Sequence, residues 1–178
     1  MHIRYATVRK RIARNPYTVT NVRNVWECDL LDVHSYAKYN DNFRYILSVI
    51  DVFSKFLYLI PVKTKSGPAV TAAFLSIFDD TPKLTSRRPV WVRTDKGNEF
   101  FNKHFQDMLR DEGIQFQACR NPDVKCAVVE RDQRTIRDRL YKYFTYKNTF
   151  RYIDVLPKFV RVYNEQSRAT HSHGWSQI

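Results

Sequence analysis

The sequence VWECDLLDV, residues 25–33, is an apolar, strand-like run with an acid, Asp29, near its centre. Two more runs, FRYILSVI at 43–50 and KFLYLIPV at 55–62, are rich in the β-branched and aromatic residues that favour strands. The short link DVFS joins them, and a turn cluster, YNDN at 39–42, precedes them. These three runs predict an antiparallel meander at the start of the fold.

The segment after the meander predicts a helix followed by a strand. Ser66, Gly67 and Pro68 give the helix start. The apolar residues that follow have helical spacing: Val70, Phe74, Ile77 and Phe78. A strand is predicted over 89–94, and Asp95 comes directly after it.

A second helix is predicted after the turn Lys96-Gly97-Asn98, with Asn98 as its cap and Gly113 as its stop. Its apolar positions again have helical spacing: Phe101, Phe105, Met108 and Leu109. A short alternating strand over 114–118 follows.

Two helices complete the order of elements. One is predicted over 128–146, and Asp154 can cap the other, which tolerates Pro157 in its first turn. The order β-β-β-α-β-α-β-α-α predicts an α/β fold, a mixed five-stranded sheet flanked by helices. In such sheets, ligands gather where strand ends and helix starts open a crevice.

The composition favours a folded domain with an anionic partner. A chain of 178 residues with 43% hydrophobic and 15% aromatic residues can bury a core and is not disordered. Its net charge of +12 favours a polyanion such as nucleic acid, although charge alone selects no reaction. No run approaches the roughly 18 apolar residues of a membrane span. The three cysteines are expected to be buried, reduced thiols of an intracellular protein.

The distribution of charge suggests how the chain is divided. Residues 1–26 contain lysine and arginine but no acid. We therefore expect a basic N-terminal arm over 1–22, a core domain over 23–170 and a C-terminal tail over 171–178.

Three acids lie in settings that belong together. Asp29 and Asp95 follow strand-like runs, and Glu130 opens a basic helical stretch 35 positions after Asp95 (130 − 95 = 35). Mg²⁺ prefers carboxylate oxygens and keeps several waters, so two or three acids suffice to bind it. Two such ions about 3.5–4 Å apart activate the attacking oxygen and stabilise the departing one in phosphodiester chemistry. We predict that these acids hold divalent metal against a nucleic-acid phosphate, with no protein nucleophile.

Three other acids are alternatives. Asp32 faces the opposite side of its strand from Asp29, and Asp51 ends a strand in a context typical of turns. Glu99 follows Asp95 in the same loop and can act as a neighbour of a metal ligand. Any of the three could replace one member of the predicted set.

The helix over 128–146 has two faces. At 100° per residue, Arg134, Arg137 and Tyr141 lie close to Glu130. The apolar residues form an adjoining stripe: Val129, Ile136, Leu140 and Tyr143. Arginine matches phosphate oxygens and tyrosine stacks on bases, so the polar face predicts DNA contact. A solvated face with ion pairs such as Glu130–Arg134 is the alternative. The residues assigned to DNA contact are Arg134, Arg137, Tyr141, Lys125, Lys96 and Asn98.

The chain resembles the catalytic core of retroviral-type integrases, especially those of retrotransposons and of Maverick/Polinton DNA transposons. The matching motifs are W-x-x-D from Trp26 to Asp29, VIDVFSKF at 49–56, TDKGNEF at 94–100, VVERDQRT at 128–135 and YIDVLPKFVRVYN at 152–164. Together they span about residues 22–170, which is most of the chain.

This resemblance implies an RNase H-like fold and a D,D-E metal site. Asp29 would bridge two Mg²⁺ or Mn²⁺ ions, Asp95 would hold one of them and Glu130 the other. The implied activities are trimming of the 3′ end of element DNA by water and joining of the new 3′-hydroxyl to target DNA. The implied partners are element ends, target DNA and further copies of the chain in a dimer or larger assembly. The implied location is the nucleus.

The chain also departs from the family pattern. Asp132 and Gln133 stand where relatives commonly have an aromatic residue and Asn, and the segment 124–127 lacks a usual glycine. The zinc-binding and C-terminal DNA-binding domains of complete integrases have no counterpart, so we expect an excised core or a fragment. Two other functions fit the same residues: a DNA-binding module without catalysis, and an RNase H-like nuclease that cuts RNA in hybrids.

Overall fold

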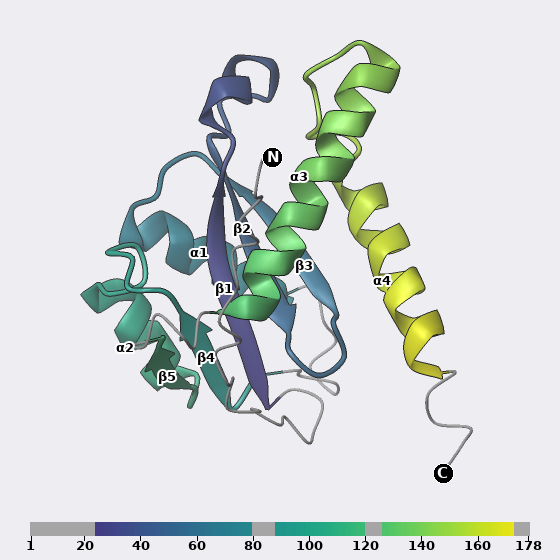
Figure 1. Cartoon of the computed structure of the whole chain (residues 1–178). Coiled ribbons are helices and arrows are strands. Elements are labelled where there is room, and N and C mark those ends of the chain that lie inside the picture. Colours follow the sequence, from purple (N-terminus) through teal and green to yellow (C-terminus); the bar gives the residue numbers. More distant parts are fainter. Residues whose placement is uncertain (1–23, 80–87, 120–125, 173–178) are drawn as a thin grey trace, which may run out of the picture.

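The computed structural model describes residues 24–79, 88–119 and 126–172 (Figure 1). Five strands form one sheet in the order β3-β2-β1-β4-β5. The strands are β1 (Val25–Asp32), β2 (Tyr45–Asp51), β3 (Leu57–Val62), β4 (Trp91–Thr94) and β5 (Gln115–Ala118). The helices are the 3-10 helix η1 (His34–Tyr39) and the α-helices α1 (Gly67–Asp79), α2 (Lys103–Asp111), α3 (Ala127–Lys147) and α4 (Leu156–Ser172).

The sheet is mixed, as the sequence predicts. Strands β1, β2 and β3 pair in antiparallel fashion, which confirms the meander, whereas β4 is parallel to both β1 and β5. The strand β1 that carries Asp29 is therefore central, with neighbours of both kinds. At the edge, β3 contains Pro61, a position where the missing N–H costs no ladder bond inside the sheet.

The two faces of the sheet bury separate apolar clusters. On one face, Trp26 and Cys28 of β1 pack with residues of α1 and α2, among them Phe74 and Phe105. On the other face, Leu31 of β1 packs with residues of α3 and α4. Because alternate strand residues face opposite sides, Glu27 and Asp29 share the α3 side with Leu31. In Figure 1, α3 crosses this face in front of β1.

The helical stripes predicted for α1 and α3 are confirmed. Val70, Phe74 and Ile77 of α1 are buried. In α3, Val129, Ile136 and Leu140 are buried, and the residues predicted on the polar face are exposed. The helix α3 ends where Asn148 adopts a left-handed conformation, with φ of 49°.

The start of α2 differs from the prediction. Its N-cap is Asn102, whose side-chain oxygen accepts from the Phe105 amide at 3.1 Å, and not Asn98. The segment before it forms a turn that buries Phe100 fully, so the helix can begin only at Lys103. Phe101 therefore lies outside the helix and is 47% exposed, which contradicts its predicted place on the buried stripe. The predicted stop is confirmed, because Gly113 has a φ of 69° that favours glycine.

Two further features differ from expectation or lie beyond it. The helix η1 had no counterpart in the prediction. Asp154, expected to cap α4, accepts from the Arg151 guanidinium with both carboxylate oxygens, at 2.5 and 3.0 Å.

The predicted basic arm over 1–22 lies outside the described residues, as does the tail beyond Ser172. No helix in the described part of the chain is both long and apolar enough to span a membrane.

Candidate active site

The register of two parallel strands brings Asp29 and Asp95 together. Cys28 of β1 pairs with Thr94 of β4, and each acid is the next residue along the chain. Neighbouring strands lie about 4.8 Å apart, so the two backbone positions are adjacent at the carboxyl end of β4. This is the edge of the sheet where the sequence predicts a ligand crevice.

Both carboxylates are oriented by nearby backbone amides. Asp29 is half-buried, and its Oδ1 accepts from the Leu30 amide at 2.8 Å. Asp95 is exposed, and its Oδ1 accepts from the Gly97 amide at 3.0 Å.

Glu130 lies in the first turn of α3, on the same side of the sheet as Asp29. Its side chain is exposed, and its amide donates to the Cys126 carbonyl at 3.0 Å, the first regular bond of the helix. Glu130 and Arg134 form no ion pair in the structure, so the alternative of a face laced by that pair is not supported.

The electrostatics place these acids in one group. The pKa of Asp29 is raised to about 6, first by burial and then by the negative charges of Asp95, Glu130 and Glu99. Burial alone can raise the pKa of a carboxyl group, and nearby negative charges raise it further. The three predicted acids and Glu99 therefore interact electrostatically at this edge of the sheet.

The Glu99 side chain lies against Gly97 of its own loop. A Cβ placed on Gly97 would come within 2.6–2.8 Å of the Glu99 carboxyl group. A side chain at position 97 would therefore require the Glu99 carboxylate to move. Among the acids that the sequence left as alternatives, Glu99 is the one whose charge helps to raise the pKa of Asp29.

The other two alternatives serve the backbone instead. Asp51 is buried, and its Oδ1 accepts from the amides of Phe53 and Ser54 at 2.8 and 3.0 Å. It shapes the turn between β2 and β3, as its sequence context predicts. Asp32 is exposed on the opposite side of β1 from Asp29, and its Oδ1 accepts from the His34 amide.

The donor set fits a hard divalent cation in its chemistry. Carboxylate oxygens are the ligands that Mg²⁺ and Mn²⁺ prefer, and a cation would relieve the repulsion that raises the pKa of Asp29. As the side chains are placed, no three His, Cys, Asp or Glu residues within 24–79, 88–119 and 126–172 are arranged to hold a metal ion. The carboxylates of Asp29 and Asp95 instead accept from backbone amides.

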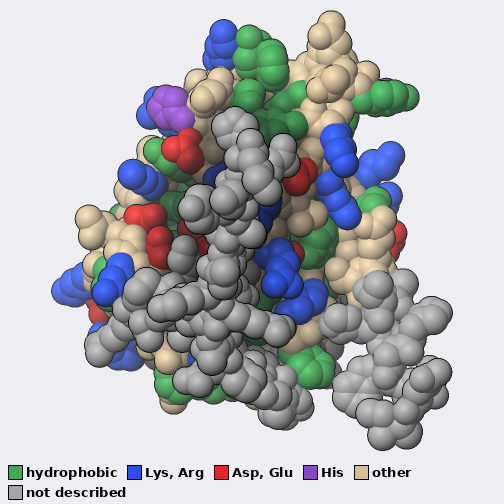
Figure 2. All heavy atoms as spheres, viewed as in Figure 1, with side chains coloured by type: hydrophobic (Ala, Val, Ile, Leu, Met, Phe, Trp, Pro, Cys, Tyr) green, Lys and Arg blue, Asp and Glu red, His purple; other side chains and the backbone are tan. Residues whose placement is uncertain are grey.

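The residues predicted to contact DNA lie on two surfaces. Arg134, Arg137 and Tyr141 are exposed along α3. Tyr141 also hydrogen-bonds to the side chain of Tyr36 in η1, so part of this tyrosine is engaged within the fold. Figure 2 shows Lys and Arg side chains gathered along α3 and the neighbouring part of α4.

The remaining predicted contacts belong to the loops beside the acids. Lys96 and Asn98 are exposed in the loop after β4, next to Asp95. Lys125 lies outside the described residues.

The sequence prediction missed one buried acid at the site. Glu27 is 4% exposed, and its Oε2 accepts from the amides of Val128 and Val129, both at 3.0 Å. The sequence did contain a signal for Glu27. It precedes Asp29 by two positions, and strand alternation therefore places both acids on the same face of the sheet. Nothing local to α3, however, indicates that its first turn binds a residue about a hundred positions away.

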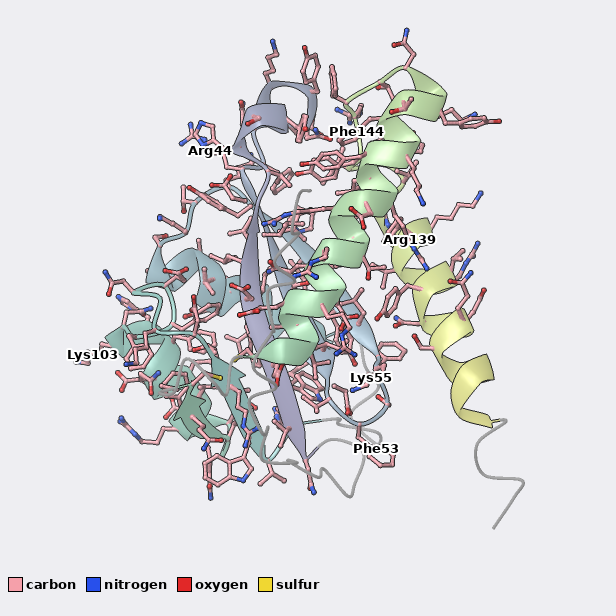
Figure 3. The ribbon with its side chains drawn as sticks, viewed as in Figure 1. Arg44, Phe53, Lys55, Lys103, Arg139 and Phe144 are labelled. Carbon is pink, nitrogen blue, oxygen red and sulfur yellow. The ribbon has the colours of Figure 1, made fainter. Side chains whose placement is uncertain are left out.

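The two departures from the family pattern pack inside the fold. Asp132 and Gln133 are both buried, and Asp132 accepts from the Tyr163 hydroxyl of α4 at 2.6 Å. Burial raises the pKa of Asp132, and the nearby Lys55 opposes that shift. In Figure 3, Lys55 lies beside the N-terminal half of α3, and Arg139 lies between α3 and α4. The bonds of Asp132 to Tyr163 and of Arg139 to Gln166 join the two helices.

Comparison with known protein families identifies the class. The family described as integrase core domain matches residues 20–123, which is more than half of the chain. The chain therefore belongs to the integrase core domain family. Asp29 and Asp95 lie inside the matched range, and Glu130 lies seven positions past its end (130 − 123 = 7).

One relative connects the chain with mobile elements. An uncharacterized transposon-derived protein of Caenorhabditis elegans is 35% identical to it over 129 residues, which is 72% of this chain and 43% of that protein. The chain thus spans less than half the length of this relative.

Solved structures of retroviral integrases share the fold. The catalytic core of HTLV-2 integrase, solved with magnesium in a dimeric form, matches with a TM-score of 0.61 and 18% identity over 79% of this chain and 86% of its own. A trimeric form of the same core gives a TM-score of 0.54, with 19% identity over 83% of this chain and 84% of its own. The simian T-cell lymphotropic virus intasome, in complex with PP2A regulatory subunit B56 gamma, matches with a TM-score of 0.59 and 20% identity. The match covers 71% of this chain and 43% of the chain in that structure. The fold is RNase H-like, as the sequence resemblance implied.

Proposed function

We propose that this chain is the catalytic core of a metal-dependent polynucleotidyl transferase that trims the 3′ ends of element DNA and joins them to target DNA. The observation that carries the proposal is the strand register, which makes Asp29 and Asp95 neighbours where β1 and β4 pair, with Glu130 in the first turn of α3 on the same side of the sheet as Asp29. The negative charges of Asp95, Glu130 and Glu99 help to raise the pKa of Asp29, which agrees with this placement. Membership of the integrase core domain family supports the same reaction class.

In this proposal the acids hold two Mg²⁺ or Mn²⁺ ions. Asp29 would contribute to both ions, Asp95 to one and Glu130 to the other, after the carboxylates rotate from their backbone amides. Bound metal would activate the attacking oxygen and stabilise the leaving oxygen. The magnesium-bound integrase core of HTLV-2, which shares the fold, supports the choice of cation.

The chain itself would bind and orient DNA. Arg134 and Arg137 lie four and seven positions after Glu130, so phosphates beside the acid group fall within reach of their guanidinium groups. Lys96 and Asn98 lie in the loop that contains Asp95, and Tyr141 lies farther along α3. Lys125, outside the described residues, is also proposed to contact DNA. Both proposed steps are displacements at phosphorus, and the second conserves the number of bonds, so no ATP is required.

We further propose that the core acts as a dimer or larger assembly in the nucleus. The dimeric and trimeric forms of the HTLV-2 integrase core support assembly, and the transposon-derived relative supports chromosomal DNA as the target. The activity of the whole protein remains part of this proposal, because the chain spans only part of that relative.

Replacing Asp95 with Asn tests the chemistry. We expect wild-type protein to nick or join labelled element-end DNA with Mn²⁺ or Mg²⁺, and Asp95→Asn to lose this activity by at least about a hundredfold, since a neutral amide is a poor metal ligand. The matched control is Asp32→Asn, an exposed acid on β1 that faces away from the site and should keep activity.

Each result separates a different function. Equal activity of wild type and Asp95→Asn would refute the assignment of the acids. Salt-sensitive DNA binding with no metal-dependent chemistry in the wild type would identify a non-enzymatic DNA-binding module. Cleavage confined to RNA in RNA–DNA hybrids would identify a nuclease of the same fold.

A further inference from the structure

Glu27 joins the elements that carry two of the three proposed metal ligands, Asp29 on β1 and Glu130 on α3. It belongs to β1, two residues before Asp29 and on the same face. Its Oε2 accepts from the amides of Val128 and Val129 at the start of α3, both at 3.0 Å. One buried carboxylate therefore binds the backbone of a helix that is 101 residues away in sequence.

The start of α3 has no cap of its own. The N-cap residue, Cys126, makes no side-chain capping bond. Val128 and Val129 are the second and third residues of the helix, whose amides an N-cap side chain normally satisfies. Glu27 meets this need from another strand, and its negative charge also suits the positive end of the helix dipole.

Glu130 follows directly after the two bonded amides. Its own amide is the first in α3 that donates to a regular helical partner, the Cys126 carbonyl. The position of Glu130 relative to β1 therefore depends on how the preceding turn is held. Arg93 is the direct neighbour of Glu27 on β4. Burial raises the pKa of Glu27, and the two amide bonds and the charges of Arg93 and Lys55 oppose that shift.

We propose that Glu27 is a positioning residue that fixes the distance between Asp29 and Glu130 by tying the first turn of α3 to β1. This role rests on the proposed metal site. It predicts that metal binding depends more on the length of the side chain at position 27 than on its charge. The side-chain oxygen must reach the two amides of α3 to accept their hydrogen bonds.

Three variants and one matched control test this role. Glu27→Ala removes both bonds, Glu27→Asp keeps the charge but shortens the reach, and Glu27→Gln keeps the reach without the charge. The control is Asn164→Ala, which also removes a buried side chain with two bonds to a distant backbone, but between α4 and β3. The readouts are the Mn²⁺ dissociation constant from calorimetry and the thermal midpoint without metal.

We expect Glu27→Ala and Glu27→Asp to weaken Mn²⁺ binding about tenfold or more, the range typical of groups that orient metal ligands. Glu27→Gln should stay within about threefold of wild type. Asn164→Ala should lose thermal stability but bind Mn²⁺ within about twofold of wild type. Amide hydrogen exchange at Val128 and Val129 should accelerate in Glu27→Asp and not in Asn164→Ala.

The positioning role is overturned if Glu27→Asp and Asn164→Ala have the same Mn²⁺ dissociation constant. This comparison remains valid even if Glu27→Ala does not fold. A larger loss in Glu27→Gln than in Glu27→Asp would also overturn it, since charge and not reach would then matter. Failure of the proposed function looks different. In that case, wild type and Asp95→Asn would bind Mn²⁺ equally weakly, and the role of Glu27 would fall with the site.

Discussion

At the scale of the single residue, Asp29 shows that the acid group opposes the stability of the fold. Its pKa is raised to about 6 because burial and three neighbouring acids disfavour its charged form. The protonated form thus stabilises the folded state below about pH 4, and this stabilisation is lost as the pH rises through 6. At neutral pH without metal, the charged Asp29 is a cost to the fold.

Replacing Asp29 with Asn should therefore stabilise the metal-free protein while removing activity. The rise in pKa from 3.8 to about 6 corresponds to a loss of unfolding free energy on the order of 2–3 kcal/mol at pH 7, which the uncharged Asn would restore. We expect this gain at pH 7 and little gain at pH 4, measured by urea unfolding at both pH values. A gain that does not depend on pH would contradict the electrostatic cause.

Added metal provides a control for the same prediction. Mn²⁺ should raise the stability of the wild type at pH 7 more than at pH 5, because a protonated carboxyl group is a poor ligand. Asp29→Asn should respond weakly at both pH values.

At the scale of the elements, buried amide side chains attach segments that are distant in sequence. Asn164 of α4 accepts from the Leu57 amide at 2.8 Å and donates to the Leu57 carbonyl at 2.9 Å, so it pairs with the free edge of β3. Asn40 is fully buried after η1 and accepts from the amides of Tyr152 and Ile153. The two asparagines hold the C-terminal part of the chain against the sheet and η1.

Asn164→Ala should lower the free energy of unfolding by about 2–3 kcal/mol, because it leaves a buried donor and a buried acceptor of Leu57 without partners. Chemical denaturation gives this value directly. The control is Glu165→Ala at the next, exposed position of α4, where we expect a change within about 0.5 kcal/mol. Similar effects of both variants would show that the Asn164 bonds contribute little.

Local patterns predicted most elements but not all of their boundaries. Apolar spacing was sufficient for the stripes of α1 and α3, because burial repeats with the period of the helix. It failed at Phe101, which has the right spacing but precedes the helix. The cap was misassigned because Asn98 and Asn102 are both acceptable N-cap residues, and only the burial of Phe100 selects between them.

At the scale of the whole molecule, the net charge of +12 predicts DNA binding that weakens steeply with salt. The double variant Arg134→Glu and Arg137→Glu should lower DNA affinity by about tenfold or more and reduce the salt slope by roughly two. Fluorescence anisotropy at several salt concentrations measures both quantities.

The matched control for this prediction changes the same charge elsewhere. Lys103→Glu and Arg110→Glu lie on α2, which packs on the opposite face of the sheet from α3. We expect the control to retain most of the affinity. An equal loss in both double variants would mean that overall charge, and not the face of α3, binds DNA.

The order of strands and helices, the meander, the mixed sheet and the three acids with their flanking motifs could all be predicted from the chain. These features leave periodic or short-range signals along the sequence. The effect of Glu99 on Asp29, the bond between Asp132 and Tyr163 and the bonds of Glu27 to the start of α3 became visible in the three-dimensional fold. Such contacts join a side chain to a group far away in sequence, and their energy depends on packing that no local pattern records.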